Sequence, residues 1–404
     1  MLPFPNWIQQ EIVEELHTRK IHGFFDWQAD VLSDCSLRQP SFGNLLYSAP
    51  TSSGKTLVAE LLAINNVLST GRKALFVFPY ISVAREKFVS LQKVVRRLNL
   101  RIQAYVGSSS APIDCWDIAV CTIEKANSLL NKAIDEDFIK SIGSIVIDEF
   151  HMLFDNNRGL LIEQMISKVI YLCKRKIHEV QVIGMSATFS NLMELGKWLN
   201  AKCYTTKFRP VVLNEMILSN NELIDASSNQ SLRFIGNGSE NEMELLTQLC
   251  LESLQKKMSV LVFCSSKVES EKVANSICES LIPVIESSKG NNVGLKESVL
   301  KEAVDYFIAE THCHDEAILK LVGAGVCFHH AGLTIEEREL LEDFFRAGIL
   351  RIICATSTLS SGVNLPADRV IIKAQYYGNF LTNTTYNQMV GRAGRFGRSS
   401  TGFF

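Results

Sequence analysis

The sequence predicts an α/β fold built from two tandem blocks, each a parallel sheet flanked by helices. In both blocks, short runs rich in β-branched and aromatic residues alternate with helical patterns, which is typical of parallel sheets covered by helices. A loop rich in small polar residues separates the first of these strands from the helix that follows it. An acidic pair directly follows a later strand of the same block.

The first block is predicted to cover residues 25–206, after an N-terminal segment of residues 1–24. Its helices fall between the strands, as in residues 56–68. The strands are expected at 44–48, 74–78, 118–121, 144–147 and 180–184.

The second block is predicted to cover residues 241–404. It contains a long stretch at about 281–321, rich in Glu, Lys and Ser and helical in pattern after Gly294, which we interpret as a helical insertion on the domain surface. Residues 207–240 contain Phe208-Arg209-Pro210 and then polar Ser/Asn clusters, so we predict a crossover between the blocks there. The strands of the second block are expected at 259–264, 325–329, 351–355 and 369–373.

The composition indicates a globular chain. Its 404 residues, 47% hydrophobic and 21% charged, suffice for about two to three domains with their own cores. The apolar run 57–68 is interrupted by polar residues and is shorter than the ~20 residues of a membrane span, so we expect no membrane association. Residues 1–10 contain no leader pattern, which predicts a protein that stays inside the cell. The net charge of −2 argues against a broadly basic surface, although a strand could still be held in a cleft.

The loop after the first strand has the composition and context of a phosphate-binding loop. Its backbone N–H groups and the helix N-terminus would hold phosphates, Lys55 would reach the β- and γ-phosphate oxygens, and the Thr56 hydroxyl would bind Mg²⁺. A plain strand-to-helix turn is the alternative, because Ala49 replaces the first glycine of the general pattern. The predicted phosphate-binding residues are Ala49, Pro50, Thr51, Ser52, Ser53, Gly54, Lys55 and Thr56.

The acidic pair Asp148-Glu149 directly follows the apolar run Ile145-Val146-Ile147. In parallel sheets the crevice at the carboxyl ends of the strands is where ligands bind. Asp148 can hold Mg²⁺, while Glu149 can take a proton from an attacking water. A solvated loop is the alternative for such a pair, and the phosphate-binding loop upstream favours the site.

Near the C-terminus, Arg392 and Arg395 are three residues apart in the string Gly-Arg-Ala-Gly-Arg. They would share one face if this segment were helical. Arginine is suited to bridging the oxygens of a transferring phosphate, so we predict that both act as arginine fingers.

The order of these motifs resembles that of superfamily 2 helicases: the phosphate loop, Asp-Glu-Phe-His, Ser-Ala-Thr at 186–188, and the arginine box. Two strings of the second block, HHAGL at 329–333 and ATSTLSSGVNLPA at 355–367, look like the polymerase theta family of DNA helicases, with helicase Q-like proteins close behind. The resemblance extends from about residue 5 to residue 395.

The resemblance implies two tandem RecA-like P-loop domains that bind ATP and Mg²⁺ between them, and single-stranded or branched DNA as the partner. It implies a nuclear DNA-repair helicase moving 3′-to-5′. It also implies that Gln28 reads the adenine and that Gly362 closes on the nucleotide. The residues expected to couple nucleotide state to domain closure are His151, Ser186, Thr188 and Gln388. The residues expected to contact the strand are Pro79, Ser82, Thr122, Gly332 and Thr356.

Some alternatives stay open at this point. Ser82 and Thr122 could instead cap helices. Residues 398–404 no longer follow the family, and the winged-helix and ratchet domains are missing, so we expect a fragment or a truncated product with weakened unwinding. An RNA helicase of the same superfamily, or an ATP-dependent binding or annealing module, are the competing functions.

Overall fold

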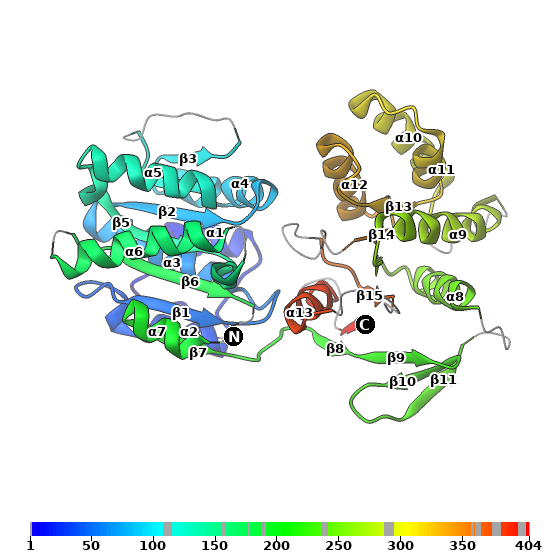
Figure 1. Cartoon of the computed structure of the whole chain (residues 1–404), viewed down its shortest axis with the longest axis horizontal. Helices are drawn as coiled ribbons and strands as arrows, with labels where there is room; N and C mark the ends of the chain where they lie inside the picture. The colour runs from blue at the N-terminus through cyan, green and yellow to red at the C-terminus, as the bar shows by residue number, and fades with distance from the viewer. Residues whose placement is uncertain are drawn as a thin grey trace. The chain divides into compact units, whose positions relative to one another are not determined.

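The computed structural model divides the chain into two compact units, Met1–Arg209 and Pro210–Phe404, called here unit 1 and unit 2. Each unit is a parallel sheet with helices packed on it, which confirms the predicted fold class (Figure 1). The structure describes residues 2–107, 115–155, 158–176, 178–187, 189, 191–235, 241–286, 295–356, 359, 365–373, 381–394 and 401–403.

Unit 1 contains a seven-stranded sheet in the order β3-β4-β2-β5-β6-β1-β7, and every neighbouring pair is parallel. The predicted strands are all present, and the side chains that alternate along them pack on both faces of the sheet. Phe76 and Phe78 pack into one apolar cluster while Leu75 and Val77 pack into the other. The strands are β1 (Asn44–Ser48), β2 (Lys73–Phe78), β3 (Ile102–Tyr105), β4 (Ile118–Thr122), β5 (Ile142–Ile147), β6 (Gln181–Ser186) and β7 (Ala201–Thr205).

Helices cover both faces of this sheet. The first face carries α1 (Gln10–Thr18), α2 (Asp26–Ser33), α3 (Lys55–Thr70) and α4 (Ile81–Arg97). The opposite face carries α5 (Ile123–Asp135), α6 (Gly159–Lys174) and α7 (Leu192–Leu199). Three short 3₁₀ turns complete the described part of the unit: η1 (Cys35–Leu37), η2 (Phe138–Ser141) and η3 (Phe150–Phe154).

Unit 2 contains a six-stranded parallel sheet in the order β13-β14-β12-β15-β16-β8, and a separate antiparallel sheet β11-β10-β9. The six strands are β8 (Val212–Asn214), β12 (Val260–Phe263), β13 (Val326–His329), β14 (Ile352–Ala355), β15 (Arg369–Ile372) and β16 (Thr401–Phe403). The antiparallel strands are β9 (Met216–Ser219), β10 (Glu222–Asp225) and β11 (Ser231–Phe234). The helices are α8 (Glu242–Gln255), α9 (Lys267–Glu286), α10 (Glu297–Thr311), α11 (Glu316–Gly323), α12 (Ile335–Ala347) and α13 (Asn383–Val390).

Two stretches of unit 2 differ from the sequence-based expectation. Residues 207–240, predicted as a crossover, contain β8 to β11, which were missed because these strands are short and largely exposed. In the predicted insertion, α10 and α11 are helical as expected. They are not a surface excursion, however, since Leu300 and Phe307 of α10 are buried in the main core of the unit.

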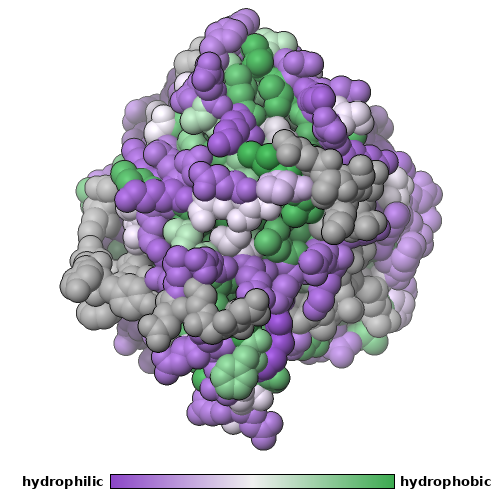
Figure 2. Space-filling model, turned by 90° about the vertical axis from the view of Figure 1, so that its right-hand side faces the viewer, coloured by the Kyte–Doolittle hydropathy of each residue, from purple (hydrophilic) through white to green (hydrophobic). Residues whose placement is uncertain are grey.

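The described residues on the side drawn in Figure 2 form no broad apolar area. Hydrophilic residues surround small groups of hydrophobic ones there. Scattered apolar side chains of this kind are normal on a folded domain and indicate no partner by themselves. Across the described parts of the chain, no helix combines the length and apolar character needed to cross a membrane.

Candidate active site

The predicted nucleotide-binding residues of unit 1 gather at one edge of its sheet. Strands β5, β6 and β1 are neighbours, and their carboxyl ends carry the acidic pair, Ser186 and the phosphate loop respectively. Ser48 is paired in register with Ser186, and the Ala49 N–H donates a 3.1 Å hydrogen bond to the Ser186 carbonyl. The loop is therefore anchored to the strand beside it, in the crevice where parallel sheets bind ligands.

The phosphate loop owes its shape to two left-handed residues and an internal hydrogen bond. Ser52 has φ 62° and Gly54 has φ 84°. The buried Ser53 hydroxyl donates to the Pro50 carbonyl at 2.6 Å. Gly54 is the N-cap of α3 and has no side chain to satisfy the first N–H groups of that helix. A loop of this form fits a phosphate group, which would accept from those N–H groups.

Lys55 lies against its own loop. Its Nζ donates to the Ala49 carbonyl at 2.8 Å and to the Pro50 carbonyl at 3.2 Å. The hydroxyl of buried Tyr47 donates to the Lys55 carbonyl at 2.6 Å, which holds the start of α3 over β1. The ammonium group is thus held at the mouth of the loop, where a bound phosphate would be placed.

Gln28 is buried and bridges two backbone segments with its amide. Its Oε1 accepts from the Phe25 N–H at 3.0 Å, and its Nε2 donates to the Gly54 carbonyl at 3.0 Å. A Cβ built on Gly54 would lie 2.5 Å from this Nε2 and would displace the amide, and the φ of 84° at this position itself favours glycine. The structure brings Gln28 to the phosphate loop as a brace, and its contact with an adenine stays a prediction.

The acidic pair lies directly beyond β5. The Asp148 Oδ1 accepts from the Glu149 N–H at 2.9 Å. Burial, and then the neighbouring Glu149, raise the pKa of Asp148 from 3.8 to about 6, against the opposing effect of Lys55 and Lys87. A carboxyl that resists ionising without a cation suits a divalent ion, which would favour its charged form. The donor set therefore fits Mg²⁺ held by Asp148 with Thr56.

The raised pKa of Asp148 predicts a pH-dependent cost to stability in metal-free buffer. That cost is zero below the ordinary pKa of 3.8, grows as pH rises, and is complete above about 6. Asp148→Asn should therefore raise the free energy of unfolding in EDTA at pH 7.5 by about 1–3 kcal/mol, because one pKa unit corresponds to about 1.4 kcal/mol. The gain should shrink towards zero near pH 4. Thermal unfolding at both pH values measures it, with exposed Asp135→Asn as the control, and a destabilised Asp148→Asn at pH 7.5 would contradict it.

His151 and Ser186, predicted to couple nucleotide state to domain movement, are in contact. The His151 Nδ1 lies 2.9 Å from the Ser186 Oγ and 3.3 Å from the Glu149 Oε2. One ring nitrogen thus faces both the acidic pair and the end of β6. Thr188, the third residue of this predicted group in unit 1, lies outside the described residues.

The residues of unit 1 that were predicted to contact DNA lie at the ends of the next β-strands along the same sheet edge. Pro79 follows β2 and Thr122 ends β4, and both strands lie beyond β5 in the sheet. Ser82 lies inside α4, whose N-cap is Tyr80, and the Thr122 side chain makes no capping hydrogen bond to α5. Ser82 is therefore not the cap of α4, whereas Thr122 does occupy the N-cap position of α5 without a side-chain capping bond.

The residues of unit 2 that were predicted to contact DNA also follow neighbouring β-strands of its sheet. Gly332 follows β13 and Thr356 follows β14. His330 shapes the first loop, since its Nδ1 accepts from the Gly332 N–H at 3.0 Å while its Nε2 lies 2.8 Å from Glu271. This ring was not predicted, although it stands in the same HHAGL string.

The arginine box is only partly described, and its described part is not helical. Helix α13, which carries Gln388, ends at Val390. Arg392 lies in the turn beyond it, and its carbonyl accepts from the Ala367 N–H at 2.9 Å. Arg392 is not helical, so the condition for a shared helix face is not met at Arg392. Arg395 and Gly362 lie outside the described residues.

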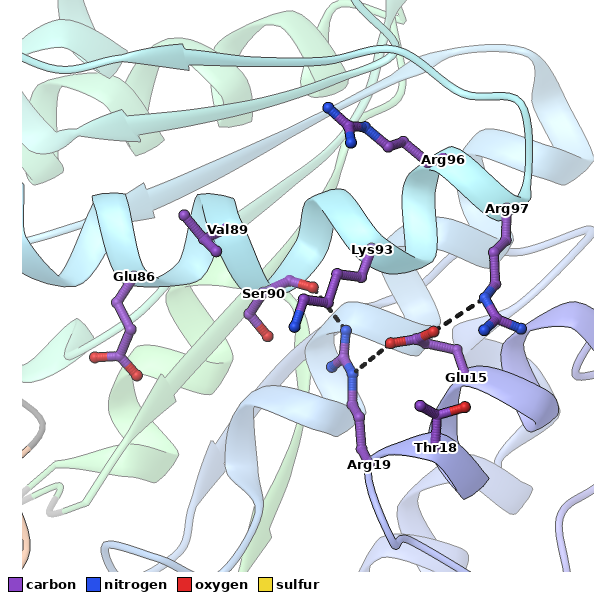
Figure 3. Close-up of a pocket in the computed structure, with 9 residues that line it drawn as sticks. All are labelled: Glu15, Thr18, Arg19, Glu86, Val89, Ser90, Lys93, Arg96 and Arg97. Carbon is purple, nitrogen blue, oxygen red and sulfur yellow. Dashed lines mark hydrogen bonds and ion pairs between the residues drawn. The ribbon is translucent and has the colours of Figure 1, made fainter. Parts of the chain in front are cut away.

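A hollow between α1 and α4 is separate from this edge (Figure 3). Buried Glu15 receives the guanidinium groups of Arg19 at 3.3 Å and Arg97 at 3.0 Å, and Arg19 also donates to the Ser90 carbonyl at 2.7 Å. These contacts join the N-terminal helix to α4. The hollow contains none of the predicted site residues, so the candidate site is defined by the sheet edge.

Two family models match the chain in the order that the two units predict. The model described as DEAD/DEAH box helicase matches residues 25–195, and the model described as helicase conserved C-terminal domain matches residues 295–397. The chain thus carries a DEAD/DEAH box helicase domain followed by a helicase conserved C-terminal domain. The helicase conserved C-terminal domain match extends over α10 and α11, so those helices belong to the matched domain.

Relatives of these helicase domains are similar over most of the chain. DNA polymerase theta of Caenorhabditis elegans is 44% identical over 99% of this chain and 24% of its own length. The human protein named Helicase POLQ-like is 34% identical over 95% of this chain and 35% of its own length. ATP-dependent DNA helicase Hel308 of Methanococcus vannielii is 35% identical over 87% of this chain and 47% of its own length. The chain thus spans about a quarter to about half the length of these relatives, and the predicted resemblance is confirmed.

Proposed function

We propose that this chain is the ATP-driven motor of a DNA helicase. The observation that carries the proposal is the single sheet edge on which the phosphate loop, the acidic pair and the His151–Ser186 contact lie on adjacent strands. The names of the similar proteins, two of which include the word helicase, support a nucleic-acid motor and favour DNA over RNA.

In this proposal each residue of the edge has a chemical task. Lys55 and the N–H groups at the start of α3 hold the phosphates, and Glu149 takes the proton of the attacking water. Mg²⁺, held by Thr56 and Asp148, supplies charge neutralisation at the phosphate oxygens when bound. Arg392 and Arg395 supply the guanidinium groups that complete the site, together with Gly362. We infer that hydrolysis is slow until those groups arrive, which links turnover to movement of one domain.

The strand-contacting surface in this proposal consists of small hydroxyl and backbone groups. Such groups hold phosphates without identifying bases, which suits a motor that must work on any sequence. Movement in the 3′-to-5′ direction, a role in DNA repair and a nuclear location are part of the proposal on the ground of the motif resemblance, and the similarity to DNA polymerase theta supports action on DNA. Imaging of a tagged chain tests the location. The proposed contacts are Pro79, Ser82, Thr122, Gly332 and Thr356.

The proposal is tested by comparing ATP turnover with single-stranded DNA and with RNA of the same length and composition. We expect stimulation by DNA to exceed stimulation by RNA. Strand displacement on duplexes with a 3′ or a 5′ tail, measured with the same preparation, should favour the 3′ tail. Stronger stimulation by RNA would replace the proposal with an RNA helicase. DNA-stimulated turnover without displacement of any strand would replace it with an ATP-dependent binding or annealing module.

A further inference from the structure

Arg158 connects three segments of unit 1 that are far apart in the sequence. Its Nη1 donates to the Pro79 carbonyl at 2.8 Å, and its Nε lies 3.0 Å from the Glu124 carboxylate. Its guanidinium also lies over the Tyr80 ring, 4.9 Å from the centroid. A planar, multidentate group stacked on a ring and bonded at two sides has a fixed position, which a lysine could not reproduce.

The partners of Arg158 lie at or next to residues that were predicted to contact DNA. Pro79 and Tyr80 form the turn between β2 and α4, and Glu124 lies in the first turn of α5, two residues beyond Thr122. The two turns follow neighbouring strands of the sheet. Arg158 therefore fixes the spacing between the two loops that are proposed to hold successive phosphates.

Arg158 also lies shortly after the acidic pair in the chain. It follows η3, the short turn that begins directly after Glu149. Its own N–H donates to the Asp155 carboxylate at 2.8 Å, and the Gly159 N–H donates to the Asp155 carbonyl at 3.0 Å. A Cβ built on Gly159 would lie 2.3 Å from the Leu153 carbonyl oxygen, so this turn is packed backbone against backbone.

We propose that Arg158 is a positioning residue that holds the loops at Pro79–Tyr80 and Thr122–Glu124 in one arrangement and ties that arrangement to the segment after the acidic pair. The consequence of this arrangement, which rests on the proposed function, is that DNA binding and ATP turnover are coupled through unit 1. The contacts themselves do not depend on that function.

The first test measures coupling. In Arg158→Ala, the concentration of single-stranded DNA giving half-maximal ATPase stimulation should rise about 5- to 20-fold, within the range typical of coupled sites. Turnover without DNA and the KM for ATP should stay within about twofold of the wild type, because Arg158 contacts none of the phosphate-loop residues. Arg158→Lys should be intermediate. Arg175→Ala is the matched control, since Arg175 follows the same helix at its other end and also lies over a tyrosine ring.

A second test does not require DNA stimulation. Hydrogen exchange of Arg158→Ala without nucleic acid should be faster in both segments, 79–84 and 122–126, and unchanged in β1 and α3. Glu124→Gln should speed exchange in the second segment alone and should add little to Arg158→Ala. If wild-type protein shows no DNA stimulation, the proposed function fails while the exchange result still tests Arg158. Unchanged exchange in both segments, or an Arg158→Ala protein with normal dependence on DNA, would overturn the inference.

Discussion

Lys55→Ala is expected to lower ATP turnover by about 10²–10³-fold or more. Removing one positioned hydrogen-bond donor from a preorganised site typically lowers the reaction rate by about that factor. Lys55→Arg should fall nearly as far, because the compact ammonium lies within 2.8 Å of the Ala49 carbonyl and a planar guanidinium needs more room. Steady-state ATPase assays with saturating single-stranded DNA measure both variants.

The control for this substitution must separate lost chemistry from lost structure. Lys174→Ala removes an exposed lysine at the end of α6 and should turn over ATP like the wild type. Thermal unfolding of Lys55→Ala should remain cooperative, although its hydrogen bonds to two loop carbonyls are gone. A folded Lys55→Ala protein that hydrolyses ATP normally would eliminate both the helicase and the ATP-dependent binding interpretations.

Glu149→Gln should stop hydrolysis while leaving ATP binding in place. General bases typically contribute about 10²–10⁴-fold to a rate, and glutamine keeps the shape of the side chain without accepting a proton. Glu149 has φ 49°, a strained position that glutamine would share equally, so the fold should be unaffected by the exchange. Binding of a fluorescent ATP analogue and ATPase assays on one preparation separate the two properties.

The expected split between binding and turnover is specific to this position. Glu163→Gln, on the exposed side of α6, provides a carboxylate-to-amide control and should change neither property. Loss of nucleotide binding in Glu149→Gln would mean that the carboxylate organises the site and does not act on water. Wild-type turnover would mean that the proton goes to another group.

The sequence predicted most accurately what depends on local pattern. The central strands of both sheets are buried on both faces, so they appear as continuous apolar runs, and all were predicted. Strands at the margins were missed, among them β7, whose exposed and partly exposed residues form no such run. The three-stranded sheet of unit 2 was missed for the same reason.

In the candidate site too, residues in contiguous motifs were predicted from the sequence and residues brought together only by the fold were not. The phosphate loop and the acidic pair are contiguous strings whose chemistry is visible without a fold. Arg158 was not predicted, because its bond to Pro79 joins residues 79 positions apart and only the order of the strands brings them together. For the arginine box, the spacing of three left open whether the segment is helical, and the structure shows that α13 ends before Arg392.

The contact between Gly159 and Leu153 has a mechanical consequence. A side chain at residue 159 would have to displace the backbone of η3, so the start of α6 can lie this close to η3 only with glycine there. We infer that a shift of η3, which begins directly after Glu149, would displace the start of α6 and with it Arg158. The two loops that Arg158 contacts would then move together.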